Sequence, residues 1–332
     1  MTTRRTILAA GLAVAAAFAV APAGALAQSK MVLKAADVHP LGYPTVEAVE
    51  RMGKKLEKAT NGRITIQMFP AMQLGGEKEM IEQAQVGALQ IARVSVGPVG
   101  TVVDDLNVFN LPFVFRNTEH MRHVIDGPIG DELLKKISDN PKTGLVGLAW
   151  MDSGARNFYN KVRDVKSIED LKGLKIRMMG NPMFVETMNA LGGNGVPMQM
   201  DQVMNALQTG VVDGAENNPP SYDSFGHVPV AKHYSLTEHL IIPEILVFSR
   251  KSFDALSKED QELVMKFGKE TQLEQRVLWD ERTKQAMDKI KAAGVNVIEI
   301  KDKKPFQDAV KPVWDKYGSK YTELVKRIQD TK

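Results

Sequence analysis

The stretch LKIRMMGNPMFVETMNALGGNGVPM, residues 174–198, decides the fold class. Its apolar start, Leu174–Met179, predicts a strand, and Asn181-Pro182 supplies an N-cap and a first helical residue for the helix that follows. Gly192-Gly193 ends that helix, and Val196–Met198 predicts a second short strand. A strand, a helix and a strand in this order are typical of an α/β sheet.

The same alternation of strands and helices continues on both sides of this stretch. The expected strands are Met31–Ala36, Ile64–Phe69, Leu89–Val94 and Ala155–Asn160, and the expected helices are Thr45–Thr60, Glu77–Val86, Ile168–Lys172 and one capped by Asp201 that runs to Thr209. This spacing predicts parallel α/β sheets. The charged stretch Ser257–Ala293 predicts a helix long enough to brace two lobes, although a simple surface helix fits the pattern equally well.

Chain length and composition restrict the class of protein. About 300 residues beyond a leader exceed the comfortable size of one core, so we expect two lobes that exchange chain segments and enclose a cleft. The 332 residues contain no cysteine, which excludes disulfides, thiolate nucleophiles and soft metal sites. The 43 basic and 40 acidic side chains nearly balance, so the charge gives no case for a nucleic acid partner.

Residues 1–27 have the parts of a secretory signal peptide. Arg4-Arg5 precedes an apolar run, Ile7–Val20, and Ala25-Leu26-Ala27 is a small-residue cleavage pattern, so we expect export and removal of this segment. The paired arginines resemble a twin-arginine export signal, and an ordinary secretion signal fits as well. A membrane anchor would need a longer apolar run without a cleavage pattern.

Arg177 is the most informative polar residue. It lies near the carboxyl end of the strand Leu174–Met179, where open α/β sheets bind their ligands. A strand covered on both faces favours apolar residues, so an arginine there needs a partner. A guanidinium group matches a carboxylate with two parallel donors, which favours an anionic ligand. An internal salt bridge with an Asp or Glu is the alternative, and the strand pattern leaves both open.

Five further residues are candidate ligand contacts. Arg93 and Arg156 each stand alone at the end of an apolar or aromatic stretch, and a structural ion pair is the alternative for both. Asn217 can bond both hydroxyls and a carboxylate, but the Asn-Asn-Pro sequence also fits an ordinary turn. Glu77 begins a helix beside two glycines, and His39 follows the first strand, where a capping or packing histidine is equally consistent.

Metal and catalytic sites find little support in the sequence. The spacing of His227, His233 and His239 does not place them on one helical face, and no HExxH motif is present. Gly192–Gly195 leads from a helix into a strand, the reverse of a phosphate-binding loop. There is no Gly-x-Ser-x-Gly elbow, and nothing fixes the separation of acids such as Glu238 and Glu244. We therefore expect no metal, no cofactor and no catalytic residues.

Three segments together resemble the extracytoplasmic solute receptors of TRAP transporters, the DctP family. They are Gly154–Asn160 (GARNFYN), Asp170–Arg177 (DLKGLKIR) and Ala206–Asn217 (ALQTGVVDGAEN), and the likeness covers essentially the whole chain after the signal. The resemblance implies that Arg177 pairs with the carboxylate of the substrate. It also implies that Arg156 and Asn217 belong to the substrate-binding site.

The resemblance implies a two-lobed α/β periplasmic binding protein fold with a central ligand cleft, crossing strands and a long helix bracing both lobes. Lobe I would comprise residues 28–153 plus about 243–281, and lobe II residues 154–242 plus about 282–332. It further implies a periplasmic receptor that is not an enzyme. Such a receptor would deliver its ligand to a small and a large integral membrane subunit of the transporter.

The segment Ala36–Val49 (ADVHPLGYPTVEAV) is similar to the branch of the family that binds hexuronates such as D-glucuronate and D-galacturonate. This similarity implies that His39, Glu77 and Arg93 contact ring hydroxyls or the far side of the sugar acid. C4-dicarboxylates, aldonates, sialic acid and oxo acids use the same fold and remain alternative ligands. A secreted enzyme acting on a sugar acid is the remaining alternative function.

Overall fold

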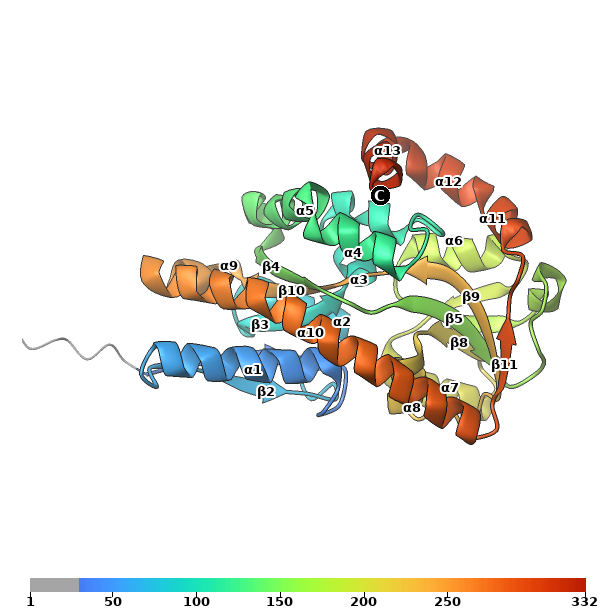
Figure 1. The fold of residues 1–332 in the computed structure, drawn as a ribbon, viewed down its shortest axis with the longest axis horizontal. Coiled ribbons are helices and arrows are strands. Elements are labelled where there is room, and N and C mark those ends of the chain that lie inside the picture. Colours follow the sequence, from blue (N-terminus) through green and yellow to red (C-terminus); the bar gives the residue numbers. More distant parts are fainter. Residues whose placement is uncertain (1–29) are drawn as a thin grey trace, which may run out of the picture.

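The computed structural model describes residues 30–332, so the predicted signal peptide, residues 1–27, lies outside the described residues. The chain forms two lobes, each built around one sheet with helices against it (Figure 1). The first sheet has the strand order β2-β1-β3-β10-β4 and the second β11-β9-β5-β8-β6-β7. The strands of the first sheet are β1 (Met31–Ala36), β2 (Ile64–Phe69), β3 (Ile91–Ser95), β4 (Leu145–Met151) and β10 (Glu244–Ser249). Those of the second are β5 (Ala155–Asn160), β6 (Lys175–Met178), β7 (Asn194–Pro197), β8 (Gly214–Asn217), β9 (His233–Ile241) and β11 (Asn296–Glu299).

The helices cover the faces of these sheets. They are α1 (Pro44–Ala59), α2 (Glu77–Val86), α3 (Val96–Val99), α4 (Thr118–Asp126), α5 (Pro128–Asp139), α6 (Pro182–Ala190), α7 (Met200–Thr209), α8 (Pro219–Ser224), α9 (Arg250–Asp254), α10 (Lys258–Ala292), α11 (Lys304–Ala309), α12 (Lys311–Tyr317) and α13 (Thr322–Asp330). Short 3₁₀ helices are Asp104–Asn110, Pro141–Thr143, Ile168–Leu171 and Gly318–Tyr321. Within residues 30–332, no helix has the length and apolar character needed to cross a membrane.

The unit β6-α6-β7 forms as the opening stretch predicts. The side chain of Asn181 accepts a hydrogen bond from the backbone N–H of Met183, and Pro182 is the first residue of α6. Gly192, with φ of +89°, takes the left-handed conformation that ends the helix turn. One local prediction is wrong: Gln199 and not Asp201 is the N-cap of α7, which begins at Met200.

The two sheets are mainly parallel, as predicted, but each contains one strand that runs antiparallel to its neighbours, which the alternation of strands and helices did not predict. β1, β2 and β3 are parallel to one another, as are β6, β7 and β8. However, β10 runs antiparallel to both β3 and β4, and β5 runs antiparallel to both β8 and β9. The reason is the chain path: β4 leads directly into β5, and β9 returns directly into β10, so each lobe receives a strand that arrives from the other.

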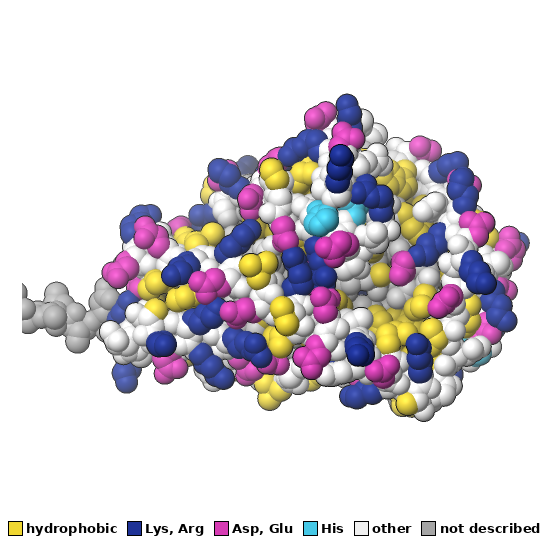
Figure 2. Space-filling model, viewed as in Figure 1, with side chains coloured by type: hydrophobic (Ala, Val, Ile, Leu, Met, Phe, Trp, Pro, Cys, Tyr) yellow, Lys and Arg dark blue, Asp and Glu magenta, His cyan; other side chains and the backbone are white. Residues whose placement is uncertain are grey.

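The long helix α10 packs against elements of both lobes, which confirms the expected brace. It begins where the Ser257 side chain accepts a hydrogen bond from the backbone N–H of Asp260. Along its length α10 contacts α1 and β4 of the first lobe and α8 of the second. Figure 1 shows it running diagonally across the molecule, and Figure 2, in the same view, shows basic and acidic side chains interspersed over this face.

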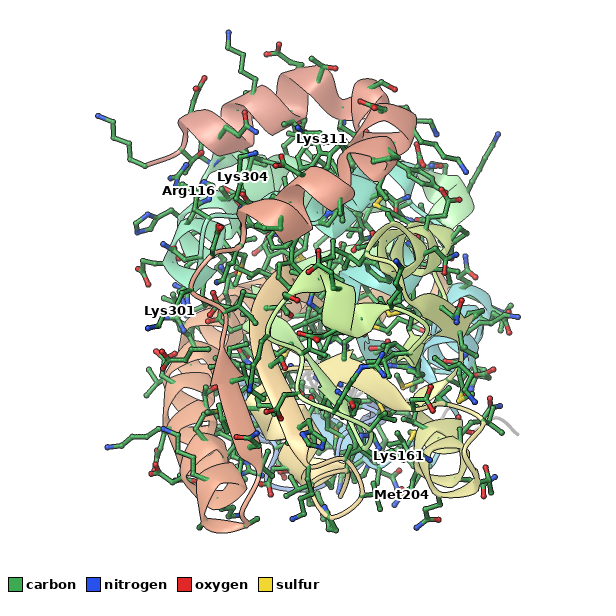
Figure 3. The ribbon with its side chains drawn as sticks, turned by 90° about the vertical axis from the view of Figure 1, so that its right-hand side faces the viewer. Arg116, Lys161, Met204, Lys301, Lys304 and Lys311 are labelled. Carbon is green, nitrogen blue, oxygen red and sulfur yellow. The ribbon has the colours of Figure 1, made fainter. Side chains whose placement is uncertain are left out.

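The C-terminal helices also touch both lobes. Figure 3 shows them across the top of the molecule, with Lys304 and Lys311 on their outer side. Among these helices, α12 packs against α6 and α13 against α5. The guanidinium group of Arg116 donates to the backbone carbonyl groups of Gln329, at 2.9 Å, and Thr331, at 2.5 Å. The end of the chain is thereby attached to the lobe that contains β4.

Two buried glutamines join α10 to the edge strand β4. Gln272 Oε1 accepts the backbone N–H of Trp150 at 3.2 Å. Gln275 Oε1 accepts the N–H of Asp152 at 2.7 Å, and its Nε2 donates to the Asp152 carbonyl at 2.9 Å. An edge strand has no neighbour on one side, so these side chains supply partners that another strand would otherwise provide.

We expect Gln275→Leu to lower the free energy of unfolding by about 2–3 kcal/mol, because leucine fills the space but leaves two buried backbone groups of Asp152 without partners. Urea denaturation at pH 7 measures the loss. The matched control is Gln285→Leu on the exposed side of the same helix, where Gln285 bonds only Glu281, and its effect should stay within about 0.5 kcal/mol. Equal losses in the two variants would contradict an anchoring role for Gln275.

Candidate ligand-binding site

A small cavity between the lobes is lined by residues from both of them. All six side chains singled out by the sequence line it, and each is at least nine-tenths buried. They are His39, Glu77, Arg93, Arg156, Arg177 and Asn217. In the first lobe, His39 follows β1, Glu77 begins α2 and Arg93 belongs to β3. In the second lobe, Arg156, Arg177 and Asn217 belong to β5, β6 and β8. The fold therefore brings together residues that lie up to 178 positions apart, from His39 to Asn217.

Arg177 has no carboxylate partner among the described residues. It is 3 % exposed, its Nε donates to the carbonyl of Met198 at 2.8 Å, and its Nη1 is buried without any hydrogen-bond partner. Burial lowers the pKa of this guanidinium from its ordinary value; the carboxylate of Glu216 opposes the shift, and the charge of Arg156 adds to it. Because a buried cation without a counter-charge is unfavourable, this position favours an incoming anion.

Arg156 differs, because an internal carboxylate neutralises it. Its Nε and Nη2 donate to the two carboxylate oxygens of Glu216, the Nη2 bond measuring 2.9 Å, and Nη2 also reaches the Glu216 carbonyl at 3.0 Å. Such a two-pronged pair fixes the plane of the guanidinium group. The internal ion pair, which the sequence left open for each arginine, is what the structure shows for Arg156.

Arg93 is surrounded by three carboxylates. Its Nη1 donates to Glu77 Oε1 at 3.0 Å and to Glu244 Oε2 at 2.5 Å, and its Nη2 donates to Asp37 Oδ1 at 2.5 Å. Burial raises the pKa of the Asp37 carboxyl, but Arg93, followed by His39, more than offsets this and holds that pKa well below its usual range. Arg93 therefore serves first as the counter-charge for a buried acidic cluster.

His39 is held as a neutral ring in the wall of the cavity. It stacks on Tyr43 with ring centroids 3.7 Å apart, and its Nδ1 lies 2.9 Å from Asp37 Oδ1. Burial lowers the pKa of the imidazole, and the charge of Arg93 adds to this effect. The neutral ring presents one nitrogen, Nε2, toward Ser221 Oγ at 3.2 Å.

Glu77 and Asn217 each keep a polar atom free for a ligand. Glu77 Oε1 accepts from Arg93 and from the N–H and hydroxyl of Ser95, both at 2.8 Å, while its Oε2 bonds none of the described residues. Asn217 Oδ1 accepts the N–H of Asn218 at 2.9 Å, and its Nδ2 has no partner within residues 30–332. Two residues that line the cavity therefore have one acceptor oxygen and one amide donor without a partner among the described residues.

Hydrogen bonds cross the cavity from one lobe to the other. Ser221, at the start of α8, bonds the hydroxyl of Tyr43 at 2.8 Å in addition to His39. On another side, Asn181 Nδ2 donates to the carbonyl of Gly97 at 2.8 Å. These contacts hold the two lobes together over the enclosed space.

Sequence patterns missed the acids that pair with the arginines. Asp37 and Glu216 each lie within two residues of a predicted site residue, so the motifs around His39 and Asn217 contain a signal for them. Glu244 has no such signal, because it reaches Arg93 only through the pairing of β10 with β3. Ser221, Phe225 and Gln199 also line the cavity without a sequence signature. Within the described part of the chain, no group of three acidic or histidine side chains is arranged to hold a metal ion.

The family can be assigned from a match that covers most of the chain. The model of the DctP family, described as bacterial extracellular solute-binding protein, family 7, matches residues 35–320. This chain belongs to the DctP family. The family prediction made from Gly154–Asn160, Asp170–Arg177 and Ala206–Asn217 is therefore confirmed.

Solved structures of other proteins resemble this DctP-family chain closely. A TRAP periplasmic solute binding protein from Pseudomonas putida F1, with bound D-glucuronate, is 54 % identical with a TM-score of 0.88, covering 90 % of this chain and 97 % of that chain. One from Citrobacter koseri with bound D-glucuronate is 47 % identical with a TM-score of 0.89, covering 91 % and 99 %. The apo, open structure from Citrobacter koseri, at 45 % identity and covering 90 % and 98 %, has a TM-score of 0.80.

These comparisons also describe the conformation of this DctP-family chain. Its arrangement is closer to the glucuronate-bound structure from Citrobacter koseri than to the open one. The buried site residues and the hydrogen bonds of Ser221 across the cavity agree with this. The site geometry described above is therefore that of two lobes joined by the hydrogen bonds of Ser221.

Proposed function

We propose that this protein is a periplasmic receptor that captures a hexuronate, such as D-glucuronate or D-galacturonate, and holds its carboxylate on Arg177. The observation that carries this proposal is that two of the three cavity arginines are paired with carboxylates and the third is not. Arg93 and Arg156 already have internal carboxylates, whereas Arg177 has a buried, unpartnered Nη1. A hexuronate carries one carboxylate and several hydroxyls, which matches one free guanidinium among neutralised polar groups. The similarity to glucuronate-bound structures supports the same ligand class.

The remaining polar atoms suit the hydroxyl groups of the sugar acid. Asn217 Nδ2 donates beside Arg177, while Glu77 Oε2 accepts from a hydroxyl on the opposite wall. Phe225 and Met179 line the same cavity and give the carbon-bound hydrogens of the ring an apolar surface. In this arrangement the carboxylate fixes the orientation of the ligand and the hydroxyl contacts select its shape.

Closure of the two lobes completes the site. We infer that the moving bodies are residues 28–153 with about 243–281, and residues 154–242 with about 282–332, hinged at the two strand crossings. The bonds of Ser221 to His39 and Tyr43 then form only in the closed state. A ligand that touches both lobes stabilises that state because it contributes contacts that the open state lacks.

The receptor role implies release without chemical change. We propose that the protein is exported by a cleaved signal peptide, carries the acid through the periplasm and delivers it to the small and large integral subunits of a TRAP transporter. The family assignment supports a solute-binding role and not a catalytic one. The cavity does place Ser221 Oγ 3.2 Å from His39 Nε2, with Asp37 on the other ring nitrogen, so recovery of the ligand unchanged is the measurement that separates a receptor from an enzyme.

We expect D-glucuronate and D-galacturonate to raise the melting temperature of the mature protein. A ligand at about 100 times its dissociation constant adds roughly 2.7 kcal/mol to the stability of the folded state. A thermal-shift screen would compare both hexuronates with D-gluconate, sialic acid, succinate, an oxo acid and neutral D-glucose. D-Glucose is the matched control, because it keeps the ring and lacks the carboxylate.

A shift with succinate or sialic acid and none with either hexuronate would refute the proposed ligand class. Recovery of the bound acid, followed by NMR, tests the receptor role separately. We expect the hexuronate to be recovered unchanged after prolonged incubation, whereas accumulation of a product would show that the protein is an enzyme.

A further inference from the structure

The ligand site contains more acidic than basic groups. Its buried charges are three guanidinium groups and four carboxylates, namely Arg93, Arg156, Arg177, Asp37, Glu77, Glu216 and Glu244. The pair of Arg156 with Glu216 is neutral, and Arg177 carries one uncompensated positive charge. The cluster around Arg93 therefore has two more carboxyl groups than guanidinium groups.

Within that cluster, two carboxylates line the cavity. Asp37 is fully used, because its oxygens accept from Arg93, the backbone N–H of His39 and the hydroxyl of Thr45. Glu77 and Glu244 each give one oxygen to Arg93, and both side chains line the cavity. Glu77 Oε2 and Glu244 Oε1 accept no hydrogen bond from the described residues. The cavity thus has acceptor oxygens on this wall, backed by surplus negative charge.

We propose that Glu77 and Glu244 form an acidic wall that selects acids with a single carboxylate and rejects polyhydroxy dicarboxylates. This inference rests on the proposed capture of a hexuronate by Arg177. Hydroxyl groups can donate to Glu77 Oε2 and Glu244 Oε1, so a monocarboxylate sugar acid satisfies both ends of the site. A ligand with a second carboxylate has no free cation to meet it, because both Arg93 and Arg156 are already paired.

The rejection follows from like charges placed close together at buried side chains. A second carboxylate placed beside Glu77 and Glu244 must either remain charged next to them or take up a proton. Both alternatives weaken binding, whereas a hydroxyl at the same position gains a hydrogen bond to a charged acceptor. Selection here uses a repulsive element as well as an attractive one, and the two are located in different lobes.

The test compares D-glucuronate with D-glucarate, a six-carbon acid that carries a carboxylate at each end. Isothermal titration calorimetry would measure both ligands against the full mature protein, Glu77→Gln and Glu244→Gln. These substitutions keep the shape of the side chain and remove one charge, so differences in ligand shape cancel between the proteins. The matched control is Glu82→Gln, on the same helix as Glu77 but exposed and outside this cavity.

We expect the wild-type protein to bind D-glucuronate and to bind D-glucarate at least about 100-fold more weakly. Glu77→Gln and Glu244→Gln should each narrow this ratio by roughly tenfold, because one repulsive charge is removed. Glu82→Gln should leave the ratio unchanged. Thermal unfolding of each variant confirms that it is folded before titration.

Two other outcomes separate this inference from the proposed function. If the wild-type protein binds D-glucuronate and D-glucarate with similar affinity, or if neither cavity variant changes the ratio, the acidic wall is refuted and the hexuronate receptor stands. If the wild-type protein binds no hexuronate, the proposed function fails and this inference fails with it.

Discussion

Arg177→Ala is expected to reduce hexuronate affinity by at least about 100-fold while the protein stays folded, because a buried charge-assisted pair is lost. Nothing else in the cavity can replace it, since Arg93 and Arg156 are held by their own carboxylates. Isothermal titration calorimetry measures the loss, and urea denaturation without ligand measures folding. Arg177→Lys should also bind poorly, because an ammonium group cannot reproduce two parallel donors.

The surface variant Arg51→Ala is the matched control for this experiment. Arg51 lies on α1 in an exposed ion pair with Glu47 and does not line the cavity. Exposed ion pairs contribute about 0–1 kcal/mol to stability. Its affinity for a hexuronate should equal that of the wild type. Full affinity retained by Arg177→Ala would show that the carboxylate is held elsewhere, and the proposed orientation of the ligand would be wrong.

Arg93→Met is expected to lower the free energy of unfolding by about 3–5 kcal/mol, the range found when one partner of a buried ion pair is removed. The variant leaves Asp37, Glu77 and Glu244 together without their shared cation. Arg177→Met is the matched comparison, because it removes a buried arginine that has no carboxylate partner. It should leave ligand-free stability equal to that of the wild type or raise it. Equal losses in the two variants would contradict the different roles assigned to the two arginines.

The difference in free energy of unfolding between the wild type and Arg93→Met should become smaller as the pH falls from about 7 toward about 5. Burial raises the pKa of Glu77, and in the wild type the charge of Arg93 opposes that effect. Without Arg93 the folded-state pKa values of Glu77 and Asp37 rise, so the folded state of the variant binds more protons than that of the wild type. Stability of the variant relative to wild type is then lost as the pH rises through those values and is regained on acidification. Urea denaturation at several pH values measures this slope.

Local sequence signals predicted the elements that carry the site. The bounds of β1, β2, α2 and β5 follow from apolar runs and helix starts, and Ser257 indicates the start of α10 through its capping chemistry. The position of Arg177 near the end of a strand was sufficient to place it in the cavity. These features depend on residues within a few positions of one another, which is why sequence patterns reveal them.

Local sequence patterns could not predict which charged residues and which strands pair when they lie far apart in the chain. Whether Arg177 or Arg93 is the free cation depends on which acids the fold brings near, and Glu244 reaches Arg93 from 151 positions away. The antiparallel direction of β5 and β10 likewise depends on the chain passing between lobes, which no run of residues encodes. The sequence therefore selected residues that the fold brings together around one cavity, but it left open which of the arginines are paired with internal carboxylates.

The position of β10 has a consequence for the timing of folding. This strand lies between β3 and β4, although it is synthesised after all of β5–β9. Until residue 249 has left the ribosome, the first sheet lacks an inner strand, and β3 and β4 have no partner between them. Completion of the first sheet therefore follows the synthesis of the strands β5–β9 of the second lobe. This late completion keeps the first lobe unfolded for longer, which favours a secretion route that exports unfolded chains. A route that exports folded proteins can act only after the second half of the chain has been synthesised.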